Sequence, residues 1–548
     1  MANNQPFKTM MKAFVLSLCA VVTAQVISAQ DPAFSGDGYL RQKGIDVTRY
    51  QIEVEITPNS KEIAGHTDVT FNLQDSSAST LALDFADMFV DSVSGASQKL
   101  AFQYDKNRIT ISLGSPWLKK KHNTVSIYYH GTPQDGLYLG ANKFGDWVAF
   151  SDNWPNRAHF WFPGIDHPSD KATVEFKITG PADYKVVANG KLIGETQLKN
   201  GRKTSHWIEN EPIPTYCMVF GAAHFSVLQN SHATTVPLAF YVYPKDSKAG
   251  EADFQKAGQM LAYYSSLIAP YPYEKLALVQ STTRFGGMEN SSAIFFDEKS
   301  ITGEHLITGT VAHEIAHQWF GDSVTESDWY HLWLSEGFAT YFATLFFEHI
   351  QGKAVLRNSM AAQRKRIVAF QVRVGPKAIV DTTVTDLFRL LNPNNYQKGS
   401  WVLHMLRGIM GDDKFFAGIR AYYHRFQEGN ALTRDFQKVM EMSYGQSLDW
   451  FFNEWIFAGG YPEYLASWTW KAEKRTVEIS ISQNQTGQIF RMPLTVQLDY
   501  AHSSRRETIW VDAKTNTFSF ASAEKPSQLI FDPDGWVLKR MELKTPDQ

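Results

Sequence analysis

The spacing of hydrophobic residues along this 548-residue chain changes twice. Up to about residue 246 they alternate with polar residues, as at Tyr50, Ile52 and Val54, which is typical of half-buried β-strands. From about residue 250 they recur every three to four residues, which indicates amphipathic helices. Alternation returns beyond Gly459 and Gly460. A chain of this length is too long for one hydrophobic core, so we expect each pattern to form its own domain.

These patterns predict a multidomain α+β protein. Residues 1–29 are predicted to be a signal peptide, 30–246 an antiparallel β domain, 247–460 a mostly helical domain and 461–548 a small C-terminal β-sandwich. The residues that carry recognisable chemistry lie in the helical part.

The first thirty residues have the composition of a secretory signal. Lys8 and Lys12 precede an apolar run, residues 13–22, that is too short to span a bilayer, and Ala24 and Ala29 suit cleavage. We therefore expect export to the periplasm or outside the cell; an uncleaved N-terminal anchor is the alternative. No second apolar stretch has membrane-spanning length, so no integral membrane segment is expected after signal removal.

Charge and cysteine content exclude several classes of protein. The formal net charge is −3, from 53 basic and 56 acidic residues, so no nucleic-acid partner is expected. The two cysteines are Cys19 and Cys217, and removal of the signal would leave Cys217 alone. Neither a disulfide framework nor a cysteine-rich zinc site is therefore possible.

A His-Glu-x-x-His sequence is the strongest chemical signal. His313 and His317 are one helical turn apart and point the same way, so both imidazoles can reach one ion, while Glu314 lies beside them as a general base. A catalytic zinc needs a third protein ligand, and Glu336, eighteen residues after His317, is the candidate. Taken alone, Glu336 is better explained as a carboxylate favoured near a helix N-terminus.

The predicted chemistry follows from one Zn²⁺ per chain. Zinc lowers the pKa of a bound water from about 16 to about 7 and polarises a substrate carbonyl. Glu314 would accept the proton of that water and pass it to the leaving amine, and a further donor must stabilise the oxyanion.

The chain resembles the aminopeptidase N family of gluzincin zinc metallopeptidases, which includes leukotriene hydrolase. The resemblance combines the metal motif and Glu336 with Gly286-Gly-Met-Glu-Asn290, and extends to residues 162–172, 317–321, 333–339 and 396–399. It implies a saddle-like N-terminal β domain, a thermolysin-like catalytic domain and cleavage of the N-terminal residue from peptides with a free N-terminus.

The resemblance also implies roles for individual residues. Glu289 is implied to bind the α-amine of the substrate, and Tyr396 to donate a hydrogen bond to the oxyanion. The neighbouring Gly286, Gly287, Met288 and Asn290 complete the implied substrate-binding sequence.

Two departures from the family pattern stand out. Where the family places a second amine-binding Gln or Glu, this chain has Trp154, and Asp152 is the nearby residue that could replace it. The family's long helical C-terminal domain is not expected in this sequence, so the site should be open and should accept longer peptides. Turnover of ten-residue peptides compared with dipeptides tests that expectation.

Other functions remain open at the level of sequence. A thermolysin-like zinc endopeptidase shares the metal motif but must leave the amine end of its cleft open. A zinc protein that binds peptides without cleaving them, and a hydrolase of lipid epoxides, are less consistent with Glu289, Glu314 and Tyr396. The preferred N-terminal residue, the physiological substrate and the oligomeric state cannot be derived from these patterns.

Overall fold

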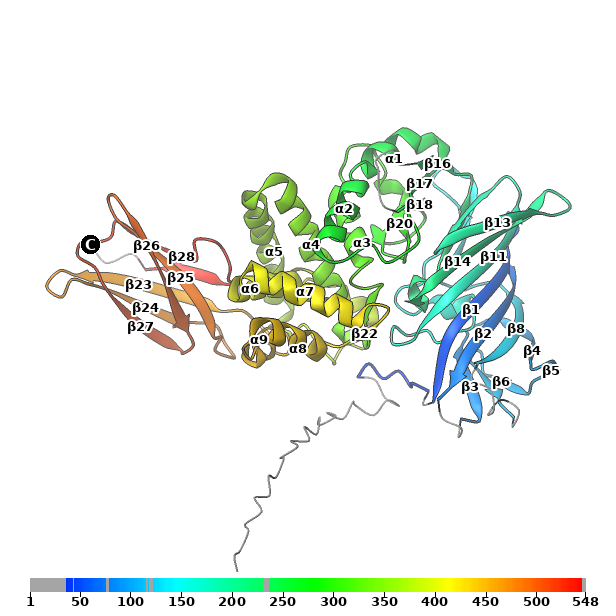
Figure 1. Cartoon of the computed structure of the whole chain (residues 1–548), viewed down its shortest axis with the longest axis horizontal. Helices are drawn as coiled ribbons and strands as arrows, with labels where there is room; N and C mark the ends of the chain where they lie inside the picture. Colours follow the sequence, from blue (N-terminus) through cyan, green and yellow to red (C-terminus); the bar gives the residue numbers. More distant parts are fainter. Residues whose placement is uncertain are drawn as a thin grey trace, which may run out of the picture.

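The computed structural model describes residues 36–42, 44–74, 78–114, 117, 122–229 and 236–544. The predicted signal peptide, residues 1–29, lies outside the described residues. Three regions follow one another along the longest axis of the molecule: N-terminal β-sheets, a helical middle region and C-terminal β-sheets (Figure 1). The predicted fold class is confirmed.

The N-terminal region is built on an eight-stranded sheet in the order β13-β14-β11-β1-β2-β8-β4-β5. Neighbouring strands are antiparallel, except that β1 and β11 pair in parallel. The alternation seen in the sequence is the alternation of buried positions along β1, where Tyr50, Ile52 and Val54 point into the core. The strands are β1 (Ile45–Glu55), β2 (Ile63–Leu73), β4 (Phe89–Gly95), β5 (Gln98–Lys99), β8 (His122–Gly131), β11 (Lys171–Pro181), β13 (Lys191–Gln197) and β14 (Arg202–Pro214).

Two smaller sheets complete this region. The first has the order β3-β7-β6 and the second the order β12-β15-β10-β9. Their strands are β3 (Thr80–Asp84), β6 (Phe102–Tyr104), β7 (Arg108–Ser112), β9 (Leu137–Ala141), β10 (Trp147–Ser151), β12 (Lys185–Ala188) and β15 (Phe220–Ala223). Among its described residues are also the short 3-10 helices η2 (Ala158–Phe160) and η3 (Thr215–Cys217).

The middle region begins with a five-stranded sheet in the order β16-β17-β18-β20-β19, in which β17, β18 and β20 are parallel. Its first two strands precede the predicted boundary at residue 246, because alternation identifies a strand but not the sheet that the strand joins. The short strand β19 pairs antiparallel with β20 and forms an edge of the sheet. The strands are β16 (Ser226–Gln229), β17 (Leu238–Val242), β18 (Leu276–Ser281), β19 (Gly287–Met288) and β20 (Ala293–Asp297).

Nine α-helices are described in the middle region. Helices α4 and α6 approach closely where Gly337 meets Gly399: a Cβ added at Gly337 would lie 2.9 Å from the Cα of Gly399. The helices are α1 (Ser247–Phe254), α2 (Ala257–Leu267), α3 (Thr308–His317), α4 (Trp333–Gln351), α5 (Lys353–Val374), α6 (Gly399–Met410), α7 (Asp412–Phe426), α8 (Thr433–Tyr444) and α9 (Asp449–Trp455).

Shorter elements connect these helices. A parallel two-stranded pair joins β21 (Val324–Glu326) to β22 (Gly429–Ala431). The short helices are η4 (Pro244–Asp246), η5 (Glu298–Ser300), η6 (Trp329–His331), η7 (Leu387–Leu390) and the π-helical η8 (Asn394–Lys398). Within the described residues, no helix is both long enough and apolar enough to cross a bilayer.

The C-terminal region consists of two small sheets, β27-β24-β23-β29 and β26-β25-β28. His404 of α6 connects it to the middle region: the imidazole stacks on Trp536 with ring centres 4.5 Å apart, and its Nε2 lies 3.2 Å from the carbonyl oxygen of Gly535. The strands are β23 (Glu463–Lys471), β24 (Thr476–Gln483), β25 (Met492–Asp499), β26 (Ser504–Val511), β27 (Thr515–Ala521), β28 (Gln528–Phe531) and β29 (Arg540–Leu543).

Candidate active site

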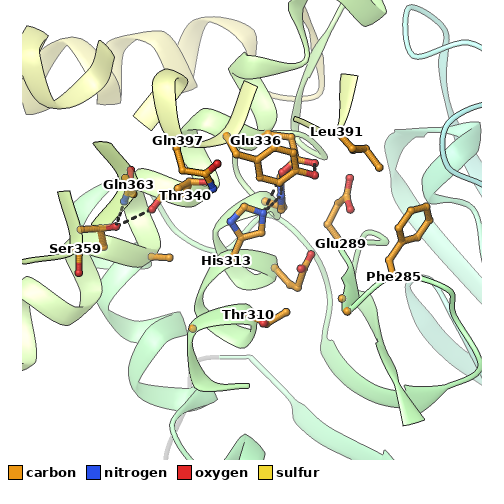
Figure 2. Close-up of a pocket in the computed structure, with 18 of the residues that line it drawn as sticks. Phe285, Glu289, Thr310, His313, Glu336, Thr340, Ser359, Gln363, Leu391 and Gln397 are labelled. Atoms are coloured by element: carbon orange, nitrogen blue, oxygen red, sulfur yellow. Dashed lines mark hydrogen bonds and ion pairs between the residues drawn. The ribbon is translucent and has the colours of Figure 1, made fainter. Parts of the chain in front are cut away.

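Three side chains from α3 and α4 converge at the centre of the middle region. His313 and His317 lie one turn apart on α3, with their Nε2 atoms 3.0 Å from each other. Glu336, in the first turn of α4, places its Oε2 atom 3.0 Å from Nε2 of His313 and 3.3 Å from Nε2 of His317. Figure 2 shows the ring of His313 directed at the Glu336 carboxylate.

This arrangement fits a tetrahedral zinc ion. Zinc binds imidazole and carboxylate atoms at about 2.0–2.2 Å, so the ligand atoms of a tetrahedral site stand about 3.3 Å apart. The three ligand atoms here are separated by 3.0–3.3 Å. A second group, made of Glu289, Glu314 and His317, also has ligand atoms within 4.8 Å of one another, but it has only one imidazole. With two imidazoles and one carboxylate at these separations, the His313, His317 and Glu336 set is the better match to zinc.

The environment of His317 orients it for metal binding. Its Nδ1 lies 3.1 Å from the carbonyl oxygen of Phe320 and 3.1 Å from the hydroxyl of Ser335. A hydrogen bond donated by Nδ1–H to the Phe320 carbonyl leaves the lone pair of Nε2 free for a metal ion.

Charge in the site is concentrated in buried groups. Burial, together with the neighbouring His317, lowers the pKa of His313. Burial alone would also lower the pKa of His317, but the Glu336 and Glu289 carboxylates raise it well above its usual value. The pKa of Glu336 is lowered because the two imidazoles outweigh the effect of burial.

Glu314 faces the neighbouring strand β19. Its side chain is buried, and this burial raises its pKa well above the usual value. A Cβ added at Gly287 would lie 2.4 Å from Oε1 of Glu314 and 2.7 Å from its Cγ. Only glycine therefore lets the β19 backbone pass beside this carboxylate.

Glu289 follows β19 and projects into the same cavity. The side chain of Gln318 holds this loop against α3, because its Nε2 donates to the Glu289 carbonyl at 2.7 Å and its Oε1 accepts from the Ser292 amide at 2.8 Å. Burial raises the pKa of Glu289 to about 7. One carboxylate oxygen of Glu289 lies within 4.8 Å of a ring nitrogen of His317. No role was predicted for Gln318, although it directly follows the metal motif and lies in a segment that resembles the family.

Tyr396, in η8, completes the cluster. Its hydroxyl donates to Oε1 of Glu336 at 2.7 Å, and its ring stacks against that of His313 with centres 5.9 Å apart. The close contact between α4 and α6 described above brings η8 to this position. Burial and the Glu336 carboxylate raise the pKa of Tyr396 well above its usual value, so the hydroxyl keeps its proton and remains a donor.

These groups line one cavity of about 560 Å³, a size typical of small-ligand sites. Of the residues predicted from the sequence, Asn290 does not line the cavity and is fully buried. The predicted residues that line it are Gly286, Gly287, Met288, Glu289, His313, Glu314, His317, Glu336 and Tyr396. Lining residues that the sequence did not indicate include Phe285, Thr340, Phe347, Ser359, Gln363, Arg366, Leu391 and Gln397.

Of the two residues considered for the second amine-binding position, Trp154 lines the cavity and Asp152 does not. Trp154 lines the cavity and packs edge-to-face against Phe285, with ring centres 5.9 Å apart. Asp152 lies outside the cavity lining and is bound by the Arg157 guanidinium at 2.7 Å and the backbone amide of Arg284 at 3.2 Å. Asp152 is therefore engaged within the protein rather than presented as a second amine anchor.

Fold and site together define a multidomain α+β protein with a His-His-Glu group that could hold a metal ion, and sequence comparison identifies its family. The profile described as "Peptidase family M1 domain" matches residues 253–455, and the "Peptidase M1 N-terminal domain" profile matches residues 47–217. The chain belongs to peptidase family M1.

Individual relatives agree with this assignment. The chain is 27% identical to glutamyl aminopeptidase of Rattus norvegicus over 339 residues, covering 58% of this chain and 35% of that protein. It is 24% identical to leucyl aminopeptidase of Saccharolobus solfataricus over 476 residues, covering 83% and 59%. In structure it resembles aminopeptidase A of Legionella pneumophila, solved in complex with aspartic acid, with a TM-score of 0.81, 18% identity and coverage of 92% and 60%. The chain thus spans between 35% and 60% of the length of these relatives.

Proposed function

We propose that this protein is a zinc-dependent aminopeptidase that removes the N-terminal residue from peptides. The observation that carries the proposal is the separation between Glu289 and the metal ligands. A Glu289 carboxylate oxygen lies within 4.8 Å of a ring nitrogen of His317. The α-amine and the carbonyl carbon of one residue are two bonds apart. An amine bound at Glu289 therefore brings the first peptide bond, and no later one, to the metal centre.

Glu289 is suited to bind an ammonium group. A buried carboxylate that meets a cation forms a charge-assisted hydrogen bond, which is stronger than one between neutral groups. Burial holds the pKa of Glu289 at about 7, and an ammonium partner favours its charged form. An endopeptidase would gain nothing from a buried carboxylate that closes this end of its cleft.

His313, His317 and Glu336 would hold the zinc ion, which supplies Lewis acidity that polarises the scissile carbonyl and makes water acidic near neutral pH. Glu314, beside the metal ligands but outside the metal-binding set, accepts the proton of the attacking water and delivers it to the leaving amine. The protonated hydroxyl of Tyr396 donates to the oxyanion that forms on the substrate.

The backbone of the substrate lies along β19. This strand is the edge of its sheet, so a peptide can add to it by strand-like hydrogen bonds, and Gly286 and Gly287 keep the approach clear of side chains. The family relatives are named as aminopeptidases, which agrees with this assignment.

The signal-like residues 1–29 lead us to propose export, which fractionation of the native host and sequencing of the mature N-terminus would test.

A pair of peptides tests the direction of cleavage. We expect the enzyme to release free alanine from Ala-Ala-Ala, and to leave the N-acetylated form essentially uncleaved. Replacing Glu289 with Gln keeps the shape of the side chain and removes its charge. Loss of one partner of a buried charge pair costs about 2–5 kcal/mol, so kcat/KM for the free peptide should fall by a factor of about 30 or more.

Zinc content and melting temperature of the Glu289→Gln variant serve as controls. Cleavage of the acetylated peptide at the rate of the free one would show an endopeptidase instead. A Glu289→Gln variant with wild-type kcat/KM would remove the amine anchor.

A further inference from the structure

The active-site cavity continues past the metal ligands along α5. Ser359, Gln363 and Arg366 all line the cavity. Their spacing of three to four residues places them on one face of the helix over two turns. In Figure 2, Ser359 and Gln363 lie on the opposite side of His313 from Glu289 and Phe285.

Helix α5 is strongly basic. Its 22 residues, Lys353–Val374, contain six lysines and arginines and no aspartate or glutamate, although the whole chain has a net charge of −3. Within the part of the chain that the structure describes, none of the six forms an ion pair within 4.0 Å. They are Lys353, Arg357, Arg364, Lys365, Arg366 and Arg373.

Arg366 is the basic residue of α5 that reaches the cavity. It is exposed, and no hydrogen bond from its guanidinium to another described residue is present. A guanidinium presents paired N–H donors that match the two oxygens of a carboxylate. Arg366 thus lines the active-site cavity with a carboxylate-binding group that has no hydrogen-bond partner among the described residues.

The direction of the substrate determines which part meets Arg366. This step rests on the proposed function, in which the α-amine is held at Glu289 and the first peptide bond lies at the metal ligands. The residues that follow the cleaved bond must then continue to the opposite side of His313, where α5 forms the wall (Figure 2).

We propose that α5 selects peptides with a carboxylate in the leaving portion, and that Arg366 is the residue that binds it. The carboxylate is supplied by the C-terminus of a short peptide or by an acidic side chain following the cleaved bond. The remaining basic residues of α5 add a positive field, which attracts such substrates and weakens at high salt.

Matched peptides measure this preference as ratios of kcat/KM. The first ratio compares Ala-Ala-Ala with its C-terminal amide, and the second compares Ala-Glu-amide with Ala-Gln-amide. Each is measured at low ionic strength for the wild type, Arg366→Gln and Lys365→Gln. Lys365 is the adjacent exposed basic residue that does not line the cavity. The two substitutions therefore remove the same charge from neighbouring positions.

In the wild type we expect at least one ratio to be about tenfold, the effect of one charge-assisted hydrogen bond. Arg366→Gln should bring that ratio close to one, whereas Lys365→Gln should retain most of it. A raised first ratio identifies the C-terminus as the carboxylate that is bound, and a raised second ratio identifies an acidic side chain; either supports the proposal.

Three results would overturn the proposal. The first is wild-type ratios near one, and the second is unchanged ratios in Arg366→Gln. The third is an equal reduction of the ratio in Lys365→Gln and Arg366→Gln, which would indicate the general field of the helix rather than a contact with Arg366. Wild-type ratios near one, with free alanine still released, would reject the carboxylate preference and leave the aminopeptidase function intact. If no alanine is released from any peptide, both the function and this inference fail.

Discussion

Substitution of Gly287 provides a way to displace Glu314, the proposed general base, without replacing a metal ligand. In Gly287→Ala, the new Cβ would lie 2.4 Å from Oε1 of Glu314, which is 1.0 Å closer than the 3.4 Å at which ordinary van der Waals contact begins. The Cγ of Glu314, at 2.7 Å, blocks a simple rotation of the carboxylate end. The side chain of Glu314 must therefore retreat by about 1 Å, and a misplacement of that size can cost about 100-fold in rate.

The assay is release of aminomethylcoumarin from alanyl-aminomethylcoumarin, followed as kcat. We expect a fall of about 100-fold in Gly287→Ala. Zinc content should be that of the wild type, because the three atoms nearest to the added methyl group all belong to Glu314 and the three metal ligands are unchanged. Gly286→Ala is the matched comparison for the position of Glu314, since a Cβ at Gly286 meets no atom within 4 Å other than its chain neighbours. Its kcat should fall much less, and any effect on peptide binding should appear in KM.

Two results would contradict this reasoning. If Gly287→Ala keeps wild-type kcat, the position of Glu314 does not limit the reaction. If it loses zinc or its cooperative melting transition, the contact is structural rather than catalytic.

Four further outcomes are expected. Glu314→Gln should retain zinc and lose about 100- to 10,000-fold in kcat, the usual contribution of a general base; a wild-type rate would place the base elsewhere. Tyr396→Phe should keep its zinc and lose about 100- to 1,000-fold in kcat, as for removal of one oxyanion donor, and an unchanged kcat would remove that role. Chelation with 1,10-phenanthroline should abolish activity and added zinc should restore it, whereas full activity in metal-free protein would exclude a catalytic metal. Burial lowers the pKa of His404 to about 4, whereas a histidine in the unfolded chain has a pKa near 6.5. As the pH drops, the unfolded chain therefore takes up the proton first, and the free energy of unfolding falls by about 3 kcal/mol between about pH 6.5 and about pH 4. In His404→Gln the denaturation midpoint should fall less over this range, and an equal fall would assign the effect to other groups.

Residues whose relative positions depend on local backbone geometry could be predicted from the sequence, whereas those brought together by packing of distant segments could not. His313 and His317 were predictable as a pair because an α-helix returns to the same face after four residues, whatever surrounds it. The three-region architecture was predictable because alternation and helical periodicity report burial on one face of each element. Glu336 was a candidate from its distance along the chain, but its position 3.0 Å from His313 depends on how α4 packs against α3.

The sequence by itself therefore determined the types of domain, the metal motif and the residues that resemble those of a known family. Only the tertiary structure decided that β16 and β17 join the sheet of the middle region, that the backbone amide of Arg284 donates to Asp152, and that Gly287 lies against Glu314. It also decided that α5 forms the wall of the cavity. Helical and strand periodicity are set by local backbone geometry, whereas these contacts join segments that lie far apart in the chain. Which segments meet depends on packing of the whole core, and no spacing in the sequence records it.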